Sequence, residues 1–319
     1  MCRGQRTVKR PARPGKSRAN NHAMDAAPTT SEPIAFMGLG RMGLPMAMNL
    51  AKKGVAVRAW NRTLRSWPDL PERLRIVSRA DDAVAGARAV IFMTTDARAV
   101  AQCLFDQGLA QSMGTGNVVI DMSTSGPKAA LQISQKLAAL GIDFVDAPVS
   151  GGVKGAERAT LTILVGATPA GFETVRPALQ CMGVPHHLGG VGSGQAAKLA
   201  NQLIVAGYIA AVAEGIQLAE TLGIDALALV QALQGGFADS AILRQHGKRM
   251  AAREFAPGGT CALHLKDLRL IAEATGPDFD RFTSTGEALR RFQHLVDTGR
   301  GELDHSAYYL TYAHGPDRV

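Results

Sequence analysis

Residues 33–63 read PIAFMGLGRMGLPMAMNLAKKGVAVRAWNRT. A short apolar run is followed by Gly38, Gly40 and Gly43 at G-x-G-x-x-G spacing, then by apolar residues at helical spacing and a second apolar run. This order predicts a strand, a tight turn, a helix and a strand, which is the unit that binds the pyrophosphate of a dinucleotide. Gly38 permits the turn, Gly40 lets the backbone approach the phosphates, and Gly43 lets helix and strand pack closely. The free N–H groups of the first helical turn then face the anion.

Alternation of strand-like and helix-like segments extends this unit over the first two thirds of the chain. Apolar runs typical of strands recur at 33–37, 55–60, 74–77, 88–93, 117–121, 142–146, 160–165 and 184–188. Helix-period segments lie between most of them, at 41–53, 126–140 and 169–181. Such alternation predicts an α/β Rossmann domain with a doubly wound, mostly parallel sheet.

The pattern changes at Gly192-Ser193-Gly194, after which strand signals disappear. Helical segments are predicted at 195–222, 225–235, 240–252, 262–275 and 281–298. We therefore expect a Rossmann domain over 32–193 and an all-helical substrate and oligomerisation domain over 194–319. The helix at 195–222 is apolar nearly all round, which is typical of a helix buried at the centre of a molecule.

The basic charge of the chain is concentrated at its start. The net charge is +8, and residues 1–24 hold seven lysines and arginines and no acidic residue, so the remainder is close to neutral. We expect 1–31 to be a disordered basic tail. Three interpretations stay open: that Met24 is the true initiator, that the tail is an organellar presequence, or that it is a nucleic-acid-binding arm. The body has no basic excess, so we expect no nucleic-acid partner for it.

Cysteine usage and hydropathy indicate a cytoplasmic protein. The four cysteines are far apart and form no C-x-x-C pair, which predicts neither disulfides nor a zinc site. The adjacent His186 and His187 would point to opposite faces of a strand, so no metal is expected there. The longest uninterrupted apolar stretch, 203–213, is too short to span a bilayer, and we expect no membrane partner.

Polar residues follow the strands at the edge where such sheets bind ligands. The second strand is followed by Asn61-Arg62-Thr63. An acidic residue at this strand end would favour NAD, but the chain has the neutral Asn61 followed by the permanently charged Arg62. Arg62 suits a 2′-phosphate, so NADP is the preferred cofactor, with NAD possible. The hydroxyls of 93–95 and 123–125 would contact the cofactor or substrate, or cap the helices that follow; Asp96 is predicted to be a cap.

Two further segments predict chemistry. In Asp146-Ala-Pro-Val-Ser150-Gly151-Gly152, a hydroxyl and unhindered backbone N–H groups could hold a small anion such as a carboxylate. Lys198 lies near the start of the apolar helix, just after the domain boundary, and shares a face with Asn201. Burial would bring its pKa toward a useful acid–base range, although its ammonium could instead reach water. We interpret Lys198 as the catalytic residue.

These motifs, in this order, resemble the β-hydroxyacid dehydrogenase family over about Pro33 to Ala313. They are the glycine loop at 38–50, the Asp146–Gly152 segment continuing to Thr160-Leu161, the helix start Gly192-x-Gly-x-x-x-Lys198-x-x-Asn201, and Leu265-Lys266-Asp267-Leu268. The resemblance implies a Rossmann domain followed by a helical domain with a fold like the C-terminal domain of 6-phosphogluconate dehydrogenase. It also implies a reversible NAD(P)-linked conversion of a 3-hydroxy acid into its semialdehyde.

The resemblance also assigns roles to residues. Lys198 matches the general acid/base of the family, and Asn201 matches the residue that orients it. Ser150, Gly151 and Gly152 match the residues that hold the substrate carboxylate. Lys266 lines the cleft between cofactor and substrate. The residues implied on the cofactor side are Gly38, Leu39, Gly40, Arg41, Met42, Gly43, Asn61, Arg62, Thr63, Thr94, Thr95, Thr124 and Lys266.

The chain departs from the common family pattern in three places. Ala159 stands where a glycine is usual, 93–95 replace a Leu-Pro form, and Gln202 replaces a second asparagine. The run Lys198–Gln202 and the segment 304–307 resemble the 2-hydroxy-3-oxopropionate (tartronate semialdehyde) reductases. The alternatives are a 3-hydroxyisobutyrate dehydrogenase or a glyoxylate/succinic semialdehyde reductase. Phe237, Asp239 and Ser240 are candidates for the specificity end.

A protein of another class is also compatible with the glycine loop, namely a non-catalytic dinucleotide-binding module. An intact Lys198 with Asn201 favours catalysis over this alternative. The long apolar helices of the second domain lead us to expect a homodimer or homotetramer.

Overall fold

The computed structural model describes residues 32–63, 65–67 and 69–312. The three interpretations of the basic tail therefore concern residues outside the described part of the chain. Cys103, Cys181 and Cys261 are free thiols and buried. Their placement agrees with the expectation that these cysteines form no disulfide.

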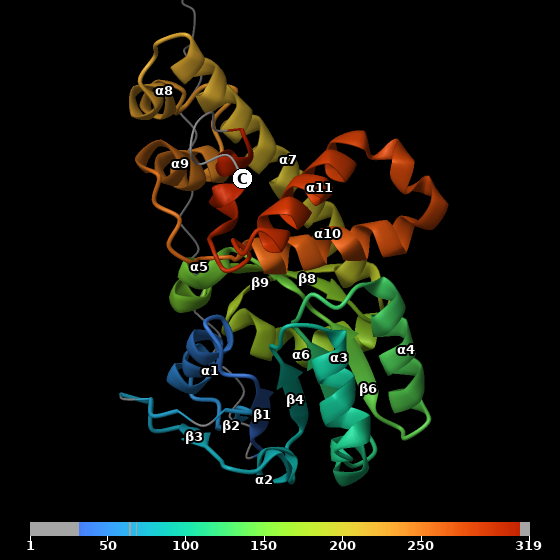
Figure 1. Ribbon diagram of the computed structural model, residues 1–319. Coiled ribbons are helices and arrows are strands. Elements are labelled where there is room, and N and C mark those ends of the chain that lie inside the picture. The colour runs from blue at the N-terminus through green and yellow to red at the C-terminus, as the bar shows by residue number, and fades with distance from the viewer. Residues whose placement is uncertain (1–31, 64, 68, 313–319) are drawn as a thin grey trace, which may run out of the picture.

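The N-terminal domain is built on a sheet whose first six strands are parallel (Figure 1). The sheet order is β3-β2-β1-β4-β5-β6-β8-β7, with β9 paired to β8. The order 3-2-1-4-5-6 is that of dinucleotide-binding folds, so the predicted fold class is confirmed. The strands are β1 (Ile34–Met37), β2 (Val57–Trp60), β3 (Leu74–Ile76), β4 (Ala89–Phe92), β5 (Val118–Asp121) and β6 (Asp143–Asp146).

Helices cover both faces of the sheet because successive strand residues point to opposite sides. Phe36 and Ile91 pack with α1 and α6, whereas Met37 and Phe92 pack with α2, α3 and α4 on the other face. The helices are α1 (Gly43–Lys52), α2 (Ala80–Val84), α3 (Ala97–Ala101), α4 (Pro127–Ala138), α5 (Gly152–Arg158) and α6 (Pro169–Gln180). Two short turns, η1 (Gln102–Asp106, a π-helical turn) and η2 (Leu109–Ser112), follow α3.

Three further strands extend the sheet beyond β6. They are β7 (Val149–Ser150), β8 (Leu161–Gly166) and β9 (Gly183–Gly189). β8 is antiparallel to β6 and β7 but parallel to β9. The sequence predicted β8 and β9 within a few residues. It gave no sign of β7, because two residues carry no readable alternation.

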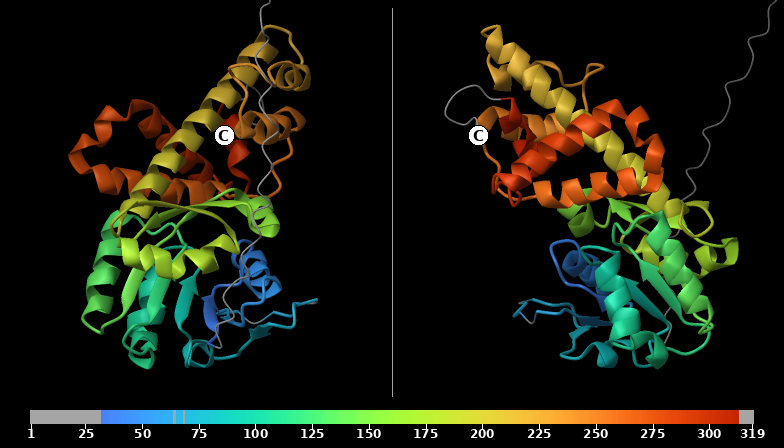
Figure 2. Two further views of the ribbon diagram at one scale, coloured as in Figure 1. Left: turned by 180° about the vertical axis from the view of Figure 1, so that it is seen from behind. Right: turned by 45° about the vertical axis from the view of Figure 1, so that its right-hand side comes forward.

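The C-terminal region is helical (Figure 2). Its elements are α7 (Ser193–Thr221), α8 (Ala226–Ala232), η3 (Leu243–Gly247), α9 (Lys248–Ala252), α10 (Cys261–Thr275), η4 (Gly276–Arg281), α11 (Thr283–Asp297) and η5 (His305–Thr311). α7 starts against the sheet and rises to the far end of the molecule, where α8 packs (Figure 1). α10 lies above β8 and β9, next to the start of α7.

The prediction that the helix at 195–222 is buried was wrong for one of its faces. Its inner residues pack in the helical core, but an outer stripe of small and apolar residues is exposed. We call this the outer stripe of α7; it consists of Ile204, Gly207, Tyr208, Ala211, Gly215, Leu218 and Leu222. The apolar character on all sides therefore reflects two different apolar surfaces, one of them uncovered in the single chain.

The full length of α7 corrects the conclusion drawn from the apolar run 203–213. By length and composition alone, α7 is long and apolar enough to cross a membrane, although the uninterrupted run 203–213 was judged too short. The helix continues the apolar pattern on both sides of that run. Core helices of soluble proteins pass the same test, and Lys198, Asn201 and Gln202 near the start of α7 contact other polar side chains.

Candidate active site

The glycine turn after β1 has the geometry that a pyrophosphate site needs. Gly38 has a φ of 104°, and a Cβ on Gly43 would overlap the carbonyl oxygen of Gly38, so both positions require glycine. A Cβ on Gly40 would meet nothing within 4 Å. Met42 is the N-cap of α1, and no described side chain accepts a hydrogen bond at this helix start. The first-turn amides of α1 therefore suit an anionic ligand.

Side chains after neighbouring strands converge on this turn. Asn61 Oδ1 accepts a hydrogen bond from the backbone N–H of Leu39 at 2.8 Å, which ties the end of β2 to the glycine loop. Arg62 and Thr63 follow at the surface, and both are exposed. Arg41 Nη1 donates to Gly258 O at 3.0 Å and so links the loop to the helical domain.

The hydroxyls after β5 do not act as helix caps, which removes one of the two interpretations of this segment. Gly126 is the N-cap of α4 and makes no side-chain cap bond. Ser123 Oγ instead accepts from the N–H of Thr94 at 2.9 Å, and Ser125 Oγ donates to Asp121 Oδ2 at 2.6 Å. Thr124, between them, is half-buried at the same edge. Thr95 is exposed beside Thr94.

Two other side chains singled out in the sequence have structural roles. Asp96 caps α3, as predicted, with Oδ1 accepting from the N–H of Ala99 at 2.9 Å. His187 stacks on Phe172 and its Nε2 lies 2.8 Å from Ala167 O.

The loop proposed for the substrate carboxylate lies between β7 and α5. Gly151 and Gly152 are exposed, with φ values of 131° and 62° that favour glycine. Ser150 Oγ donates to Asn201 Oδ1 on α7 at 3.3 Å. The structure thus brings the loop and the start of α7 together, as the two sequence motifs require.

Lys198 lies in the second turn of α7 and is only 8% exposed. Its Nζ donates to Gln202 Oε1 at 2.9 Å, and Asn201 Nδ2 donates to the same oxygen at 2.8 Å. Gln202 Nε2 in turn donates to Asp267 Oδ2 at 2.5 Å.

Asp267 and its neighbour Lys266 belong to α10. Lys266 Nζ lies 2.9 Å from Asp267 Oδ1 and donates to Thr124 O at 2.7 Å. Together with the bonds around Gln202, this gives a continuous polar chain from Ser150 to Thr124, across both domains. Gln202 and Asp267 had no predicted role, because helical spacing gives no sign of a partner on another helix.

The environment of Lys198 suits proton transfer. Burial lowers the pKa of Lys198 to about 8, with Asp267 opposing the shift and Lys266 adding to it. A lysine with such a pKa exchanges protons near neutral pH, which an ordinary surface lysine does not do.

The start of α7 is held by a buried clamp that the sequence did not reveal. Asp146, at the end of β6, accepts hydrogen bonds from the N–H groups of Gly192 and Gln195, both at 2.7 Å. Burial raises the pKa of Asp146 to about 6, while these two bonds oppose the rise. The side chain of Gln195 accepts from the N–H groups of Ser125 and Gly126. These bonds fix the helix that carries Lys198 to the ligand-binding edge of the sheet.

The described hydrogen bonds of the candidates for the specificity end are local and do not include Lys198. Phe237, Asp239 and Ser240 lie between α8 and η3, where Asp239 pairs with Arg244. This segment follows α8, which begins beyond the end of α7. The assignment of these three residues to the specificity end stays a prediction.

A histidine cluster in the helical domain resembles a metal site in composition. His246, Asp304 and His305 have potential ligand atoms within 4.8 Å of one another. However, Asp304 Oδ1 accepts from Ser306 N and Oγ, and Oδ2 accepts from Gly258 N. A carboxylate engaged in this way caps η5 and anchors the loop before α10, so we assign it a structural role.

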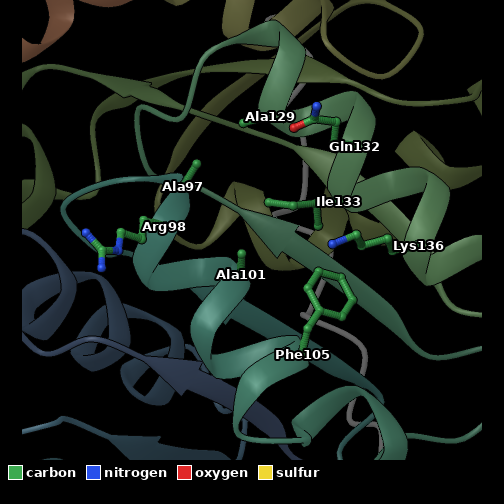
Figure 3. Close-up of a pocket in the computed structure, with 8 residues that line it drawn as sticks. All are labelled: Ala97, Arg98, Ala101, Phe105, Ala129, Gln132, Ile133 and Lys136. Atoms are coloured by element: carbon green, nitrogen blue, oxygen red, sulfur yellow. The ribbon is translucent and has the colours of Figure 1, made fainter.

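A hollow of about 220 Å³ lies on the outer side of the sheet domain, between α3 and α4 (Figure 3). Phe105 and Ile133 contribute to its wall, and Lys136 Nζ lies 5.0 Å from the ring centroid of Phe105. None of the proposed site residues lines it. The hollow is therefore separate from the candidate site.

Comparison with known proteins matches both parts of the chain to NAD-binding families. The NAD-binding domain of 6-phosphogluconate dehydrogenase matches residues 33–192, and the NAD-binding domain of NADP-dependent 3-hydroxyisobutyrate dehydrogenase matches 192–312. The chain is 38% identical to the 2-hydroxy-3-oxopropionate reductase of Escherichia coli over 86% of this chain and 94% of that protein. It is 34% identical to the 2-(hydroxymethyl)glutarate dehydrogenase of Eubacterium barkeri, over 86% and 92%.

Among solved structures, a 3-hydroxyisobutyrate dehydrogenase of Mycobacterium tuberculosis with L-serine has a TM-score of 0.77 and 30% identity, covering 89% of this chain and 99% of that one. Fold, site and relatives together define an NAD(P)-binding dehydrogenase that acts on hydroxyacids. The chain belongs to the 3-hydroxyisobutyrate dehydrogenase family of β-hydroxyacid dehydrogenases. The alternative of a non-catalytic module is not supported, since these relatives are named as enzymes.

Proposed function

We propose that this protein is an NADPH-dependent reductase of 2-hydroxy-3-oxopropionate, with Lys198 as the general acid. The observation that carries the proposal is the buried Lys198, held at the start of α7 within reach of both the Ser150 loop and the cofactor edge. The similarity to the E. coli 2-hydroxy-3-oxopropionate reductase supports this substrate over the other semialdehydes of the family.

The residues divide the reaction between them. Ser150 and the backbone amides of Gly151 and Gly152 hold the substrate carboxylate, which fixes the aldehyde carbon at the other end of the molecule. Bound NADPH supplies the hydride. Lys198, protonated at neutral pH, gives its proton to the aldehyde oxygen and so stabilises the negative charge that develops there. Asn201 orients Lys198 and substrate through its bonds to Gln202 and Ser150.

The cofactor preference rests on the residues after β2. Asn61 is engaged with the glycine loop and carries no charge, while Arg62 is exposed directly after it. A guanidinium in this place pairs with a 2′-phosphate, and the usual acidic partner of an NAD ribose is missing from 61–63. We therefore assign NADPH as the preferred cofactor, with Thr94, Thr95, Thr124 and Lys266 lining the nicotinamide side.

We also propose that the protein is a cytoplasmic homodimer or a higher homo-oligomer, with the outer stripe of α7 as its contact surface. Leu218 and Leu222 are 61% and 69% exposed, and Phe237, between α8 and η3, is fully exposed. Contiguous apolar patches of this kind mark contact surfaces. A second copy of the chain would cover the stripe.

We further propose that the two domains meet near 193–194.

The experiment that tests the function is NADPH oxidation at 340 nm with the purified protein. It compares 2-hydroxy-3-oxopropionate, succinic semialdehyde, glyoxylate and methylmalonate semialdehyde, with NADH in parallel. We expect the highest kcat/KM for 2-hydroxy-3-oxopropionate with NADPH. A clear preference for another aldehyde would replace the substrate, and equal rates with NADH would remove the cofactor preference. No turnover with any of the four, with cofactor bound, would contradict the proposed reaction.

A further inference from the structure

The amide of Gln202 stands between the two charges of the site. Its oxygen accepts from Lys198 Nζ at 2.9 Å and its nitrogen donates to Asp267 Oδ2 at 2.5 Å. An ammonium only donates and a carboxylate only accepts. The amide can therefore take just one orientation, with its dipole aligned between the anion and the cation.

We propose that Gln202 is a positioning residue that couples the carboxylate of Asp267 to Lys198 and holds Lys198 Nζ in place in both of its protonation states. The proposal rests on the proposed function, because it takes Lys198 as the proton donor. It goes beyond that function by assigning roles to Gln202 and Asp267.

The chemistry of an amide explains why glutamine suits this position. A neutral amine keeps two N–H groups, so Lys198 can donate to Gln202 Oε1 before and after it gives up its proton. The amide oxygen does not take the proton itself at neutral pH. A carboxylate in direct contact would hold Lys198 as an ammonium, whereas Gln202 places one side chain between Lys198 and the negative charge. Lys198 thus remains both anchored and able to release its proton to the substrate.

The charged neighbours of Lys198 determine in which direction each substitution shifts its pKa. Asp267 favours the ammonium, while Lys266 on the same helix disfavours it. His264, also on α10, is buried, and both burial and Lys198 disfavour its charged form, so it adds no second positive charge beside Lys198. Asp267 is 7% exposed and Lys198 8%, so the interaction takes place largely out of water. Removal of the negative charge should lower the pKa of Lys198, and a closer negative charge should raise it.

The first measurement is the pH dependence of NADPH-driven reduction. The rate falls as pH rises through the pKa of Lys198, because the ammonium is the active form. Asp267→Asn should move the midpoint of this fall down by about one pH unit, and Gln202→Glu should move it up by a similar amount. Glu273→Gln, an exposed change on the same helix, is the matched control and should leave the midpoint where it is.

A second measurement needs no turnover. Acetic anhydride reacts with the neutral amine, so the pH dependence of Lys198 acetylation, read by mass spectrometry on the intact enzyme, reports its protonation. The same order of midpoints is expected, with Asp267→Asn lowest and Gln202→Glu highest. In a Gln202→Leu background, the effect of Asp267→Asn should shrink to roughly half or less, because the connecting amide is gone.

The two hypotheses fail separately. A wild-type enzyme that reduces none of the aldehydes overturns the proposed function. Acetylation midpoints that are equal in wild type, Asp267→Asn and Gln202→Glu overturn the coupling. An undiminished effect of Asp267→Asn in the Gln202→Leu background assigns the interaction to Asp267 alone and overturns the role of Gln202.

Discussion

At the residue scale, a lysine becomes useful for acid–base chemistry when it is buried without being locked to a carboxylate. Lys198 meets this condition because its direct contact is the amide of Gln202, with Asp267 one side chain further on. Burial lowers its pKa to about 8, and Asp267 limits the decrease. The sequence supplied Lys198 and Asn201, which share one face of one helix. It could not predict that Gln202 links Lys198 to Asp267, because Asp267 comes from another helix.

Ala159 is a second residue whose environment leads to a prediction. It ends α5 in the left-handed conformation, with a φ of 55°, at the position where the family usually has glycine. An alanine in the left-handed region costs roughly 1–2 kcal/mol of conformational energy. Replacing it with glycine recovers only part of this energy, because glycine loses more conformational entropy on folding. Ala159→Gly should therefore raise the free energy of unfolding by about 0.5–1 kcal/mol, measured by urea denaturation.

Ala139→Gly provides the matched control for this prediction. Ala139 is likewise the residue that ends a helix, but it is exposed and its φ is −64°, where alanine fits well. The control should lower stability, by about 0.5–1 kcal/mol. A loss of stability in both variants would contradict the strain at position 159.

At the scale of elements, the sequence predicted most strands and helices because their patterns are local. Buried parallel strands such as β4 and β5 are uninterrupted apolar runs, and long helices such as α10 repeat their apolar face. The π-helical turns η1 and η3 and the two-residue strand β7 were missed, since each is set by the packing around it. The exposed face of α7 was missed because the sequence pattern of apolar residues does not distinguish a face that packs in the core from one that contacts a partner.

The attachment of α7 to the sheet gives a prediction at this scale. Asp146 uses both carboxylate oxygens to accept from backbone amides at the start of α7. In Asp146→Asn one of those oxygens becomes an N–H donor, which leaves a buried amide without its acceptor. The free energy of unfolding should fall by about 1–3 kcal/mol, as measured in urea, and turnover should fall with it because Lys198 loses its fixed position.

Asp143 lies at the start of the same strand and is exposed, so Asp143→Asn is the matched control. It should change neither stability nor turnover beyond experimental error. Equal effects of the two substitutions would show that Asp146 does not clamp the helix.

At the scale of the whole molecule, the two domains have separate cores and meet where the chemistry is proposed. The sheet domain buries its residues on both faces of the sheet, and the helical domain around α7, α10 and α11. The polar chain from Ser150 to Thr124 crosses this junction through α7 and α10. A movement of one domain against the other would therefore separate the substrate loop from Lys198.

The outer stripe of α7 leads to a prediction about assembly. We expect wild type to have at least twice the chain mass of 33.6 kDa in light scattering coupled to size exclusion. The double change Leu218→Glu and Leu222→Glu should yield the single chain, because buried unpaired carboxylates are costly in an interface. Leu140→Glu, which alters an exposed leucine of the sheet domain, should leave the mass unchanged. A monomeric wild type, or a double variant of unchanged mass, would contradict the interface.

The central claim is that Lys198 gives the proton in reduction, and one comparison tests it most directly. Wild type and Lys198→Met are measured on the same preparations for NADPH binding by fluorescence and for turnover of 2-hydroxy-3-oxopropionate at 340 nm. We predict an NADPH Kd that is unchanged within about twofold and a turnover lower by about 10²–10⁴-fold, the usual contribution of a general acid. Near-normal turnover with NADPH still bound would contradict the claim.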